Sequence, residues 1–261
     1  INLQAHIYHN LEQIEKSNNL FQKVLGLDEH NRQALLGTAQ NAYELNNYQK
    51  VIEITNKIKT IHGDDISSAA LRGDAFYEMK EFDYARNNFY TALKFDGNDI
   101  HVLYWLGRSI FEYHSKFNMT IDHNYEAMTY FERILELEPN NVDAMLELGV
   151  YNYSCYVNDI VGDELSFEYF DKVLEIDKDN IRALYYKGKI LHHIHYNESE
   201  SYQYFKAVEK LDDNYLDISY YLSFYYFEQE KFNESLKHAE SYLKEYEIDL
   251  DILFYQIYLK L

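Results

Sequence analysis

The sequence predicts an all-α protein, a solenoid in which pairs of helices stack one after another. Proline occurs once and glycine nine times, too few for the many tight turns of a sheet protein. Segments such as AMTYFERILELE place apolar residues at i, i+3, i+4 and i+7, which is one face of an amphipathic helix. A helix pair recurs about every 34 residues, so we expect these helices to form a repeat.

The helix pair is visible as two sets of similar segments. The first-helix segments ALRGDAFYE, LYWLGRSIFEY, AMLELGVYNY and ALYYKGKILHH place a glycine at the same point: Gly73, Gly107, Gly149 and Gly188. The second-helix segments ARNNFYTALKFD, AMTYFERILELE, SFEYFDKVLEID and SYQYFKAVEKLD share a small residue with an aromatic residue four places later. Because a residue without bulk lets two helices approach and a large residue fills the remaining gap, these positions predict packed hairpins.

These positions resemble the tetratricopeptide repeat (TPR) family, which has a small residue at repeat position 8 and an aromatic residue at position 24. Residues 66–99 fit best, with Gly73 and Phe89 at those two positions. The match is weaker over residues 1–65 and 216–249, where other residue types replace part of the pattern. The resemblance implies a right-handed α-solenoid of stacked helix-turn-helix repeats.

The repeat register divides the chain into units of a single solenoid over residues 1–261. The expected full units are residues 32–65, 66–99, 100–141, 142–180, 181–215 and 216–249. A partial unit, residues 1–31, precedes them, and residues 250–261 form a capping helix or the first helix of a further unit. Two units exceed the period near EYHSKFNMTIDHNYE and CYVNDIVGDELSF, where extra helical turns predict a neighbouring pair of protrusions.

Charge and composition limit the partners and the compartment. The formal net charge is −20, which repels a phosphate backbone, so we expect no nucleic-acid partner. A basic or aromatic segment of another protein is favoured instead, because long-range attraction raises its encounter rate. No apolar run is long enough to span a membrane. The single cysteine, Cys155, fits the cytoplasm, and a periplasmic or exported location stays open because the chain begins at Ile1 rather than Met.

The TPR resemblance implies that the first helices line a concave face, which holds an extended peptide or a helix of a partner. At the lining positions this chain is unusually aromatic. The candidate partner-binding residues are Tyr77, Tyr104, Trp105, Arg108, Tyr153, Tyr185, Tyr186, Lys189, Tyr220, Tyr221 and Phe224. Tyrosine and tryptophan offer large, stiff contact areas and are enriched at binding hot spots. The alternative is that these rings pack against neighbouring helices as core.

The sequence contains no motif that indicates catalysis. It has no nucleophile elbow, phosphate loop, zinc-hydrolase helix or dinucleotide fingerprint, so we expect neither an enzyme nor a cofactor. The clusters His192, His193 and His195, and His6 with His9, lack accompanying cysteine or acidic ligands, so we expect no metal.

The tripeptide Arg72-Gly73-Asp74 is typical of adhesion loops, but here it falls inside a first helix. A helix spreads three consecutive residues around its circumference, so no adhesion role is expected. Asp74 is expected to point toward the lining face instead.

The sequence therefore predicts a scaffold or adaptor that binds a peptide or helix of a partner protein in an aromatic groove. Two alternatives remain open: a regulatory domain that senses a peptide or small ligand, and a self-assembly module in which exposed helix faces pair between chains to form a homo-oligomer.

Overall fold

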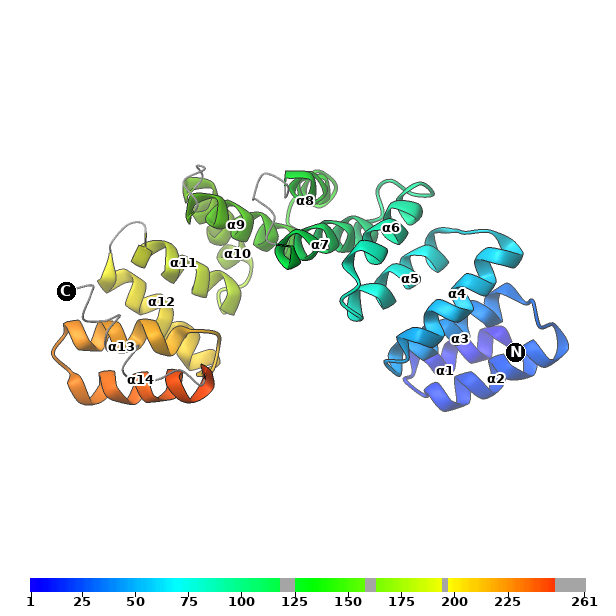
Figure 1. The fold of residues 1–261 in the computed structure, drawn as a ribbon, viewed down its shortest axis with the longest axis horizontal. Helices are drawn as coiled ribbons and strands as arrows, with labels where there is room; N and C mark the ends of the chain where they lie inside the picture. Colours follow the sequence, from blue (N-terminus) through cyan, green and yellow to red (C-terminus); the bar gives the residue numbers. More distant parts are fainter. Residues whose placement is uncertain (118–124, 158–162, 194–196, 247–261) are drawn as a thin grey trace. The chain divides into compact units, whose positions relative to one another are not determined.

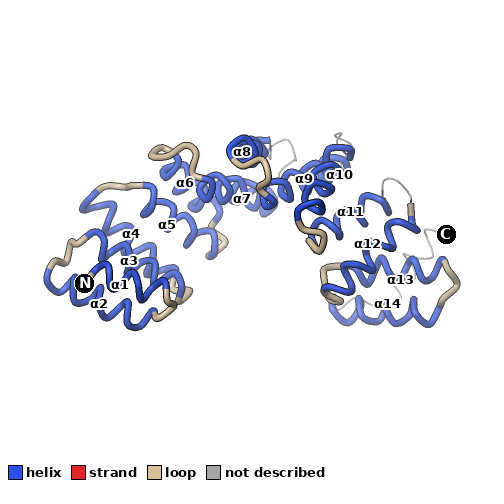
Figure 2. The backbone as a smooth tube through the Cα atoms, turned by 180° about the vertical axis from the view of Figure 1, so that it is seen from behind, coloured by secondary structure: helices blue, strands red, loops and turns tan. Residues whose placement is uncertain are grey.

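The computed structural model describes residues 1–117, 125–157, 163–193 and 197–246, which form fourteen α-helices and no strand (Figures 1 and 2). The predicted all-α solenoid fold is thereby confirmed. The chain divides into two compact units, Ile1–Asn141 and Val142–Leu261, called the first and second unit below. Among the described residues, no helix is both long and apolar enough to span a membrane.

The first unit is a stack of four helix pairs. Its helices are α1 (Asn2–Asn10), α2 (Ile14–Leu27), α3 (Arg32–Glu44), α4 (Tyr48–His62), α5 (Ile66–Glu78), α6 (Phe82–Leu93), α7 (Ile100–Lys116) and α8 (Tyr125–Leu137). Each helix packs on the next one in sequence, and the first helices of the pairs also contact one another, α1 with α3, α3 with α5 and α5 with α7. The first helices therefore form a continuous layer that can present a shared face.

The second unit repeats this arrangement with three helix pairs. Its helices are α9 (Val142–Val157), α10 (Asp163–Ile176), α11 (Ile181–His193), α12 (Glu198–Leu211), α13 (Ile218–Glu228) and α14 (Phe232–Tyr246). Each helix packs on its successor, and the first helices α9 and α11 are again in contact. The expected capping helix over residues 250–261 lies outside the described residues.

Short polar residues begin several of the helices. Asp65 starts α5 by accepting a hydrogen bond from the backbone N–H of Ser68 at 2.9 Å, and the Ser68 side chain completes a capping box. Asp99 starts α7 in the same way, through the backbone N–H of Val102 at 2.9 Å. These side chains satisfy N–H groups that have no partner within the helix, so each helix has a defined first residue.

The close crossing predicted from the four first-helix glycines is confirmed in their hairpins. A Cβ atom added to Gly73 would lie 2.7 Å from Cε1 of Phe89, which is closer than atoms can pack. The same relation holds, also at 2.7 Å, for the pairs Gly107 with Phe131, Gly149 with Phe170, and Gly188 with Phe205. Each of these aromatic rings is buried against a bare stretch of helix backbone.

The two long units have long first helices. Helix α7 has 17 residues and α9 has 16, whereas α3 and α5 have 13 each. The extra length is about one helical turn. The remainder of the predicted protrusions falls on residues 118–124 and 158–162, which lie outside the described residues.

Candidate functional site

In the first unit, α5 and α7 bring an aromatic pair together. The rings of Tyr77 and Trp105 meet edge to face with their centroids 4.7 Å apart. Tyr104 lies 5.3 Å from Trp105 on the same helix and 5.9 Å from Phe131 of α8, so it joins this pair to the core. Tyr77, Tyr104 and Trp105 are all half-buried, which leaves part of each ring open to a partner.

Arg108 continues this row one turn further along α7. Its guanidinium donates to the Tyr77 hydroxyl oxygen at 3.3 and 3.4 Å and to Oε1 of Glu112 at 2.7 Å. The structure thus brings together three of the predicted residues, Tyr77, Trp105 and Arg108. Glu112 of the same helix balances the charge of Arg108. Through its hydrogen bonds, the Arg108 guanidinium also holds the Tyr77 hydroxyl in place.

An acid and a histidine complete what we call the first-unit face, defined as Asp74, Tyr77, His101, Trp105 and Arg108. Nε2 of His101 lies 3.0 and 3.1 Å from the two carboxylate oxygens of Asp74. The hydrogen bond to Asp74 raises the pKa of His101 above its usual 6.5. Burial raises the pKa of Asp74, and His101 opposes that shift.

His101 was not among the predicted site residues, although the sequence held a signal for it. It occupies the second position of the expected unit 100–141, which is one of the lining positions implied by the TPR resemblance. The expectation that Asp74 points toward the lining face agrees with its contact to His101 of α7.

In the second unit, α9, α11 and α13 gather tyrosines around one lysine. We call this the second-unit face, defined as Tyr153, Tyr185, Tyr186, Lys189 and Tyr221. Tyr186 stacks on Phe170 of α10, with centroids 5.5 Å apart and planes at 9°, and meets Tyr153 edge to face at 5.6 Å. Tyr185 meets Tyr186 at 5.3 Å. Consecutive first helices therefore contribute to one aromatic surface.

Lys189 lies among three of these rings. Its Nζ is 5.2 Å from the ring centroid of Tyr185, 5.7 Å from that of Tyr153 and 5.9 Å from that of Tyr221. Burial lowers the pKa of Lys189, and the nearby carboxylate of Asp217 opposes the shift. Within the described part of the chain, Lys189 is contacted by aromatic rings and makes no hydrogen bond or ion pair. Such cation–π contacts stabilise the ammonium without using its N–H donors.

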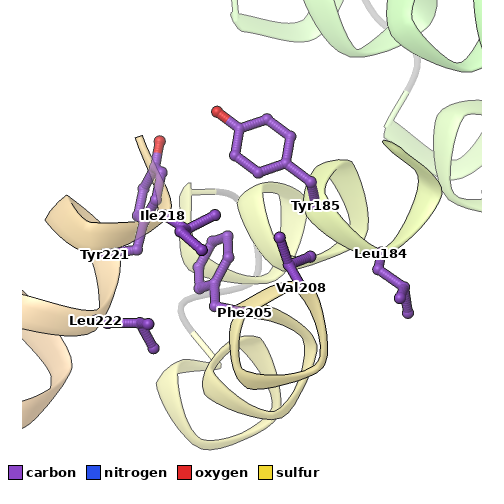
Figure 3. Packing of buried hydrophobic residues seen from close by; sticks show 7 residues of the cluster. All are labelled: Leu184, Tyr185, Phe205, Val208, Ile218, Tyr221 and Leu222. Carbon is purple, nitrogen blue, oxygen red and sulfur yellow. The ribbon is translucent and has the colours of Figure 1, made fainter. Parts of the chain in front are cut away.

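The tyrosine hydroxyls of this face are held by polar neighbours. Tyr185 donates a hydrogen bond to Asp217, which precedes α13, and the Tyr221 hydroxyl lies 3.0 Å from Nε2 of His193. Figure 3 shows Tyr185 and Tyr221 beside the buried Phe205, with their oxygens directed away from Val208. Burial raises the pKa of both hydroxyls, so they stay neutral at physiological pH.

The predicted residues differ in exposure. Half-buried are Tyr77, Tyr104, Trp105, Arg108, Tyr186, Lys189 and Tyr220. Buried are Tyr153, Tyr185, Tyr221 and Phe224. The buried rings contribute to the core as well as bordering the face: Tyr221 stacks on Phe205 at 4.5 Å, and Phe224 packs 5.6 Å from His192. Tyr220 packs against Tyr242 of α14 at 5.7 Å. Binding of a partner by these residues stays a prediction. Phe254 and Tyr255, at lining positions of the expected last helix, lie outside the described residues.

The remaining sequence motifs have structural roles where the structure describes them. The tripeptide Arg72-Gly73-Asp74 lies inside α5, as predicted, with the guanidinium of Arg72 buried 2.7 Å from Asp64. Nδ1 of His192 lies 2.8 Å from Oε2 of Glu198, and His195 lies outside the described residues. Across the described ranges, no group of three or more histidine, cysteine, aspartate or glutamate side chains stands close enough to hold a metal ion.

Stacked helical hairpins, four of them closed by a ring on a glycine, define the protein as a helical-repeat protein of the α-solenoid class. Residues 1–31 match the family model described as tetratricopeptide repeat. The resemblance to the TPR family in the sequence is thereby confirmed, in a part of the chain where the sequence pattern itself was weak. No curated protein matches this chain.

Solved structures of TPR proteins share the fold. PilF of Pseudomonas aeruginosa is similar with a TM-score of 0.69 and 15% sequence identity, over 88% of this chain and 98% of that one. A tetratricopeptide repeat protein from Parabacteroides merdae has a TM-score of 0.66 and 12% identity, over 98% of this chain and 95% of that one. YrrB, described as a TPR protein with an unusual peptide-binding site, has a TM-score of 0.57 and 19% identity, over 70% of this chain and 88% of that one. At these identities the likeness establishes the fold alone.

Proposed function

We propose that this protein is a protein–protein interaction module, a scaffold or adaptor rather than an enzyme, whose first helices hold a segment of a partner protein. The observation that carries the proposal is that the first helices of both units place half-buried aromatic rings beside charged groups. Tyr77 and Trp105 do so beside Arg108 in the first unit, and Tyr186 lies one turn from Lys189 on α11 in the second. YrrB, which shares the fold, is described as binding a peptide.

The energetics favour such a role for the half-buried rings. Covering about 100 Å² of apolar surface on a ring contributes roughly 2.5 kcal/mol. Tryptophan, tyrosine and arginine are the residue types that most often provide a large part of the free energy of binding at an interface. Trp105 and Arg108 lie one turn apart on α7, so a single partner segment can contact both.

The charges indicate which partner groups these faces accept. The net charge of −20 attracts a basic segment over long range. On the second-unit face, Lys189 has N–H donors that make no hydrogen bond within the described residues. A main-chain carbonyl of the partner can accept a hydrogen bond from the ammonium. This bond replaces a hydrogen bond to water that is lost on binding.

The test is affinity capture with two double variants. Trp105→Ala with Tyr186→Ala removes one half-buried ring from each face. The matched control, Tyr84→Ala with Tyr125→Ala, removes two rings that are 57% and 65% exposed on the second helices α6 and α8. Proteins captured by the wild type and the control, but not by the first variant, support the proposal once a synthetic peptide of the captured protein binds directly.

Circular dichroism must show that both double variants keep their helicity, because a half-buried tryptophan also contributes to packing. If all three proteins capture the same partners with equal yield, the aromatic faces are not the binding surface and the proposal is wrong.

Self-assembly is the second candidate function, because α1 carries an exposed apolar row. Leu3, Ile7 and Leu11 are spaced by four residues and are 75%, 50% and 58% exposed. A second copy of the chain that covers this row would form a homodimer. Light scattering over a range of concentrations, with Ile7→Lys as the variant, tests this: a monomer at every concentration contradicts it.

A further inference from the structure

The first-unit face contains a carboxylate that is paired with a histidine in place of a permanent cation. The side chain of Asp74 is only 13% exposed. A desolvated carboxylate is stabilised by a cation that donates hydrogen bonds to it, and here the imidazole of His101 faces both of its oxygens. Histidine is a cation for only part of the physiological pH range, so this pairing is conditional.

The exposure of the two partners indicates which one can move. The His101 side chain is 52% exposed, whereas the carboxylate lies beneath it, between α5 and α7. Because His101 is the more exposed partner, rotation of its imidazole into solvent would uncover Asp74. A cationic side chain arriving from solvent reaches the carboxylate along the same direction.

The other charged and titratable groups around Asp74 leave its surroundings negative. The negative charge of Asp99, the N-cap residue of α7, raises the pKa of both Asp74 and His101. On α5, Glu78 lies one turn beyond Asp74. From α3, the neutral hydroxyl of Tyr43 lies near these two acids: burial raises the pKa of Tyr43 most, and the charges of Asp74 and Glu78 raise it further. Arg108, two turns along α7 from His101, has Glu112 as its acid. Among these groups His101 is therefore the cation that faces Asp74.

Aromatic rings form the wall beside this carboxylate. The ring of His101 is 6.3 Å from Trp105, which in turn meets Tyr77 at 4.7 Å. A carboxylate with tryptophan and tyrosine rings nearby can bind an ammonium or a guanidinium, through a charged hydrogen bond together with cation–π contacts.

We propose that Asp74, Tyr77 and Trp105 bind a lysine or arginine side chain of the partner segment, and that His101 is an internal cation which this side chain displaces. The inference rests on the proposed function and names the chemistry of the partner at the first-unit face. Protonated His101 competes with the partner for Asp74, whereas neutral His101 does not. Binding therefore strengthens as pH rises through the pKa of His101.

The size of this effect follows from the fraction of neutral histidine. With a pKa of His101 above 6.5, at most about a quarter of the molecules carry a neutral imidazole at pH 6.0, and this fraction is at least about fourfold larger at pH 8.5. The apparent affinity for a cationic segment therefore rises at least about fourfold over this range.

The experiment uses Trp105, the only tryptophan of the chain, as a local reporter. The full-length protein is titrated at constant ionic strength with an octapeptide of lysine, and Trp105 fluorescence is followed at pH 6.0, 7.0 and 8.5. An octapeptide of glutamate is the charge control. We expect the lysine peptide alone to change the fluorescence of Trp105, with the fourfold or larger rise in affinity.

Three variants separate His101 from general electrostatics. His101→Gln should bind the lysine peptide with less than about a twofold change over the same pH range. His62→Gln, an exposed position on α4, should keep the pH dependence of the wild type. Asp74→Asn should bind weakly at every pH, with unchanged circular dichroism.

Each contrary result overturns the inference: no response of Trp105 to the lysine peptide, an equal response to the glutamate peptide, a pH-independent wild type, or a His101→Gln variant as pH-dependent as the wild type. These results leave the proposed function testable by capture with the Trp105→Ala and Tyr186→Ala double variant, so the two can fail separately.

Discussion

The two units build the same hairpin with different polar anchors. In the second unit, the side chains of Ser166 and Ser201 donate hydrogen bonds at 2.9 and 3.0 Å to the carbonyl oxygens of Gly149 and Gly188, where the helices cross. In the first unit the corresponding residue of the α5–α6 hairpin is the buried Ala85. The ring on the glycine is common to both units, and the polar anchors differ between them.

The first unit also has a buried arginine, Arg72, directly before Gly73, and the second unit has the buried Lys187, paired with Asp171, directly before Gly188. The guanidinium of Arg72 donates to Asn88 of α6 at 2.6 Å, to the carbonyl oxygen of Thr55 of α4 at 3.3 Å, and to Asp64 at 2.7 Å. One side chain thereby joins three successive helices. Arg72 thus links neighbouring hairpins, whereas Ser166 and Ser201 each donate within their own hairpin.

The largest expected effect comes from breaking the anchor of the first unit. Arg72→Leu leaves the mostly buried Asp64 with Lys59 as its remaining cation and should lower the free energy of unfolding by about 3 kcal/mol. Urea unfolding followed by Trp105 fluorescence measures it in the first unit. Arg133→Leu, which removes an exposed pair with Glu136, is the control and should cost less than about 1 kcal/mol.

The pH dependence of this anchor has a defined sign. Burial disfavours ionised Asp64, but the hydrogen bonds from Arg72 and Lys59 outweigh it and lower the pKa of Asp64 below 3.8. Its contribution to stability is therefore present above pH 3.8 and is lost as pH falls through the lowered pKa. Equal stability of Arg72→Leu and wild type at pH 7 would contradict the assigned role.

The next largest effect is expected where an aromatic ring packs on a glycine, a contact that both units contain. Gly73→Ala and Gly188→Ala each place a Cβ 2.7 Å from a buried ring and should destabilise the protein by about 1 to 3 kcal/mol. Gly26→Ala is the control, because a Cβ there meets nothing within 4 Å and alanine favours the helix, so the protein should become more stable. Denaturant midpoints of the three variants measure the contrast, and a destabilised Gly26→Ala would undermine it.

A smaller effect sharpens the contrast in polar anchors. Ser201→Ala removes the hydrogen bond to Gly188 within the second unit and should cost about 1 kcal/mol. The reverse change, Ala85→Ser, introduces the serine into the first unit, and the matching Gly73–Phe89 crossing should accept it within about 1 kcal/mol. Thermal unfolding followed by circular dichroism compares the two. A large loss for Ala85→Ser would mean that the hairpins differ in geometry and not only in chemistry.

The smallest effect concerns the His101–Asp74 pair. Because the pKa of His101 is raised in the folded protein, its contribution to stability is fully present below pH 6.5 and is lost as pH rises through the raised pKa. His101→Gln should therefore cost more free energy of unfolding at pH 5.5 than at pH 8.5, by less than about 1 kcal/mol because the imidazole is half exposed. A constant difference between wild type and variant across this range would argue against the ion pair.

The sequence predicted those parts of the fold that depend on local pattern. The spacing of Gly73 and Phe89 identified the crossing of α5 and α6, because the steric demand falls on residue types that can be recognised in any single hairpin. The pair Arg72 and Asp64 was not predicted, since an arginine inside an amphipathic helix is usually exposed and nothing in its spacing indicates burial.

The candidate site was predicted in part for the same reason. Repeat positions identified the aromatic residues, and the structure brings Tyr77 and Trp105 together. Position alone could not separate half-buried Tyr186 from buried Tyr185, because adjacent residues on α11 face in different directions. The link between Tyr185 and Asp217 depends on the packing of α11 against the residues before α13, which the sequence does not encode locally.

The ring on each glycine also constrains how this sequence can diverge. Where the aromatic residue is absent, as at Thr55 and Ala239, the corresponding first-helix position carries a side chain, Ala39 and Ser223. The glycine and the ring are thus coupled by steric contact, because a side chain added at Gly73 or Gly188 would meet the ring that packs there, so a change at one position limits which residues the other can hold.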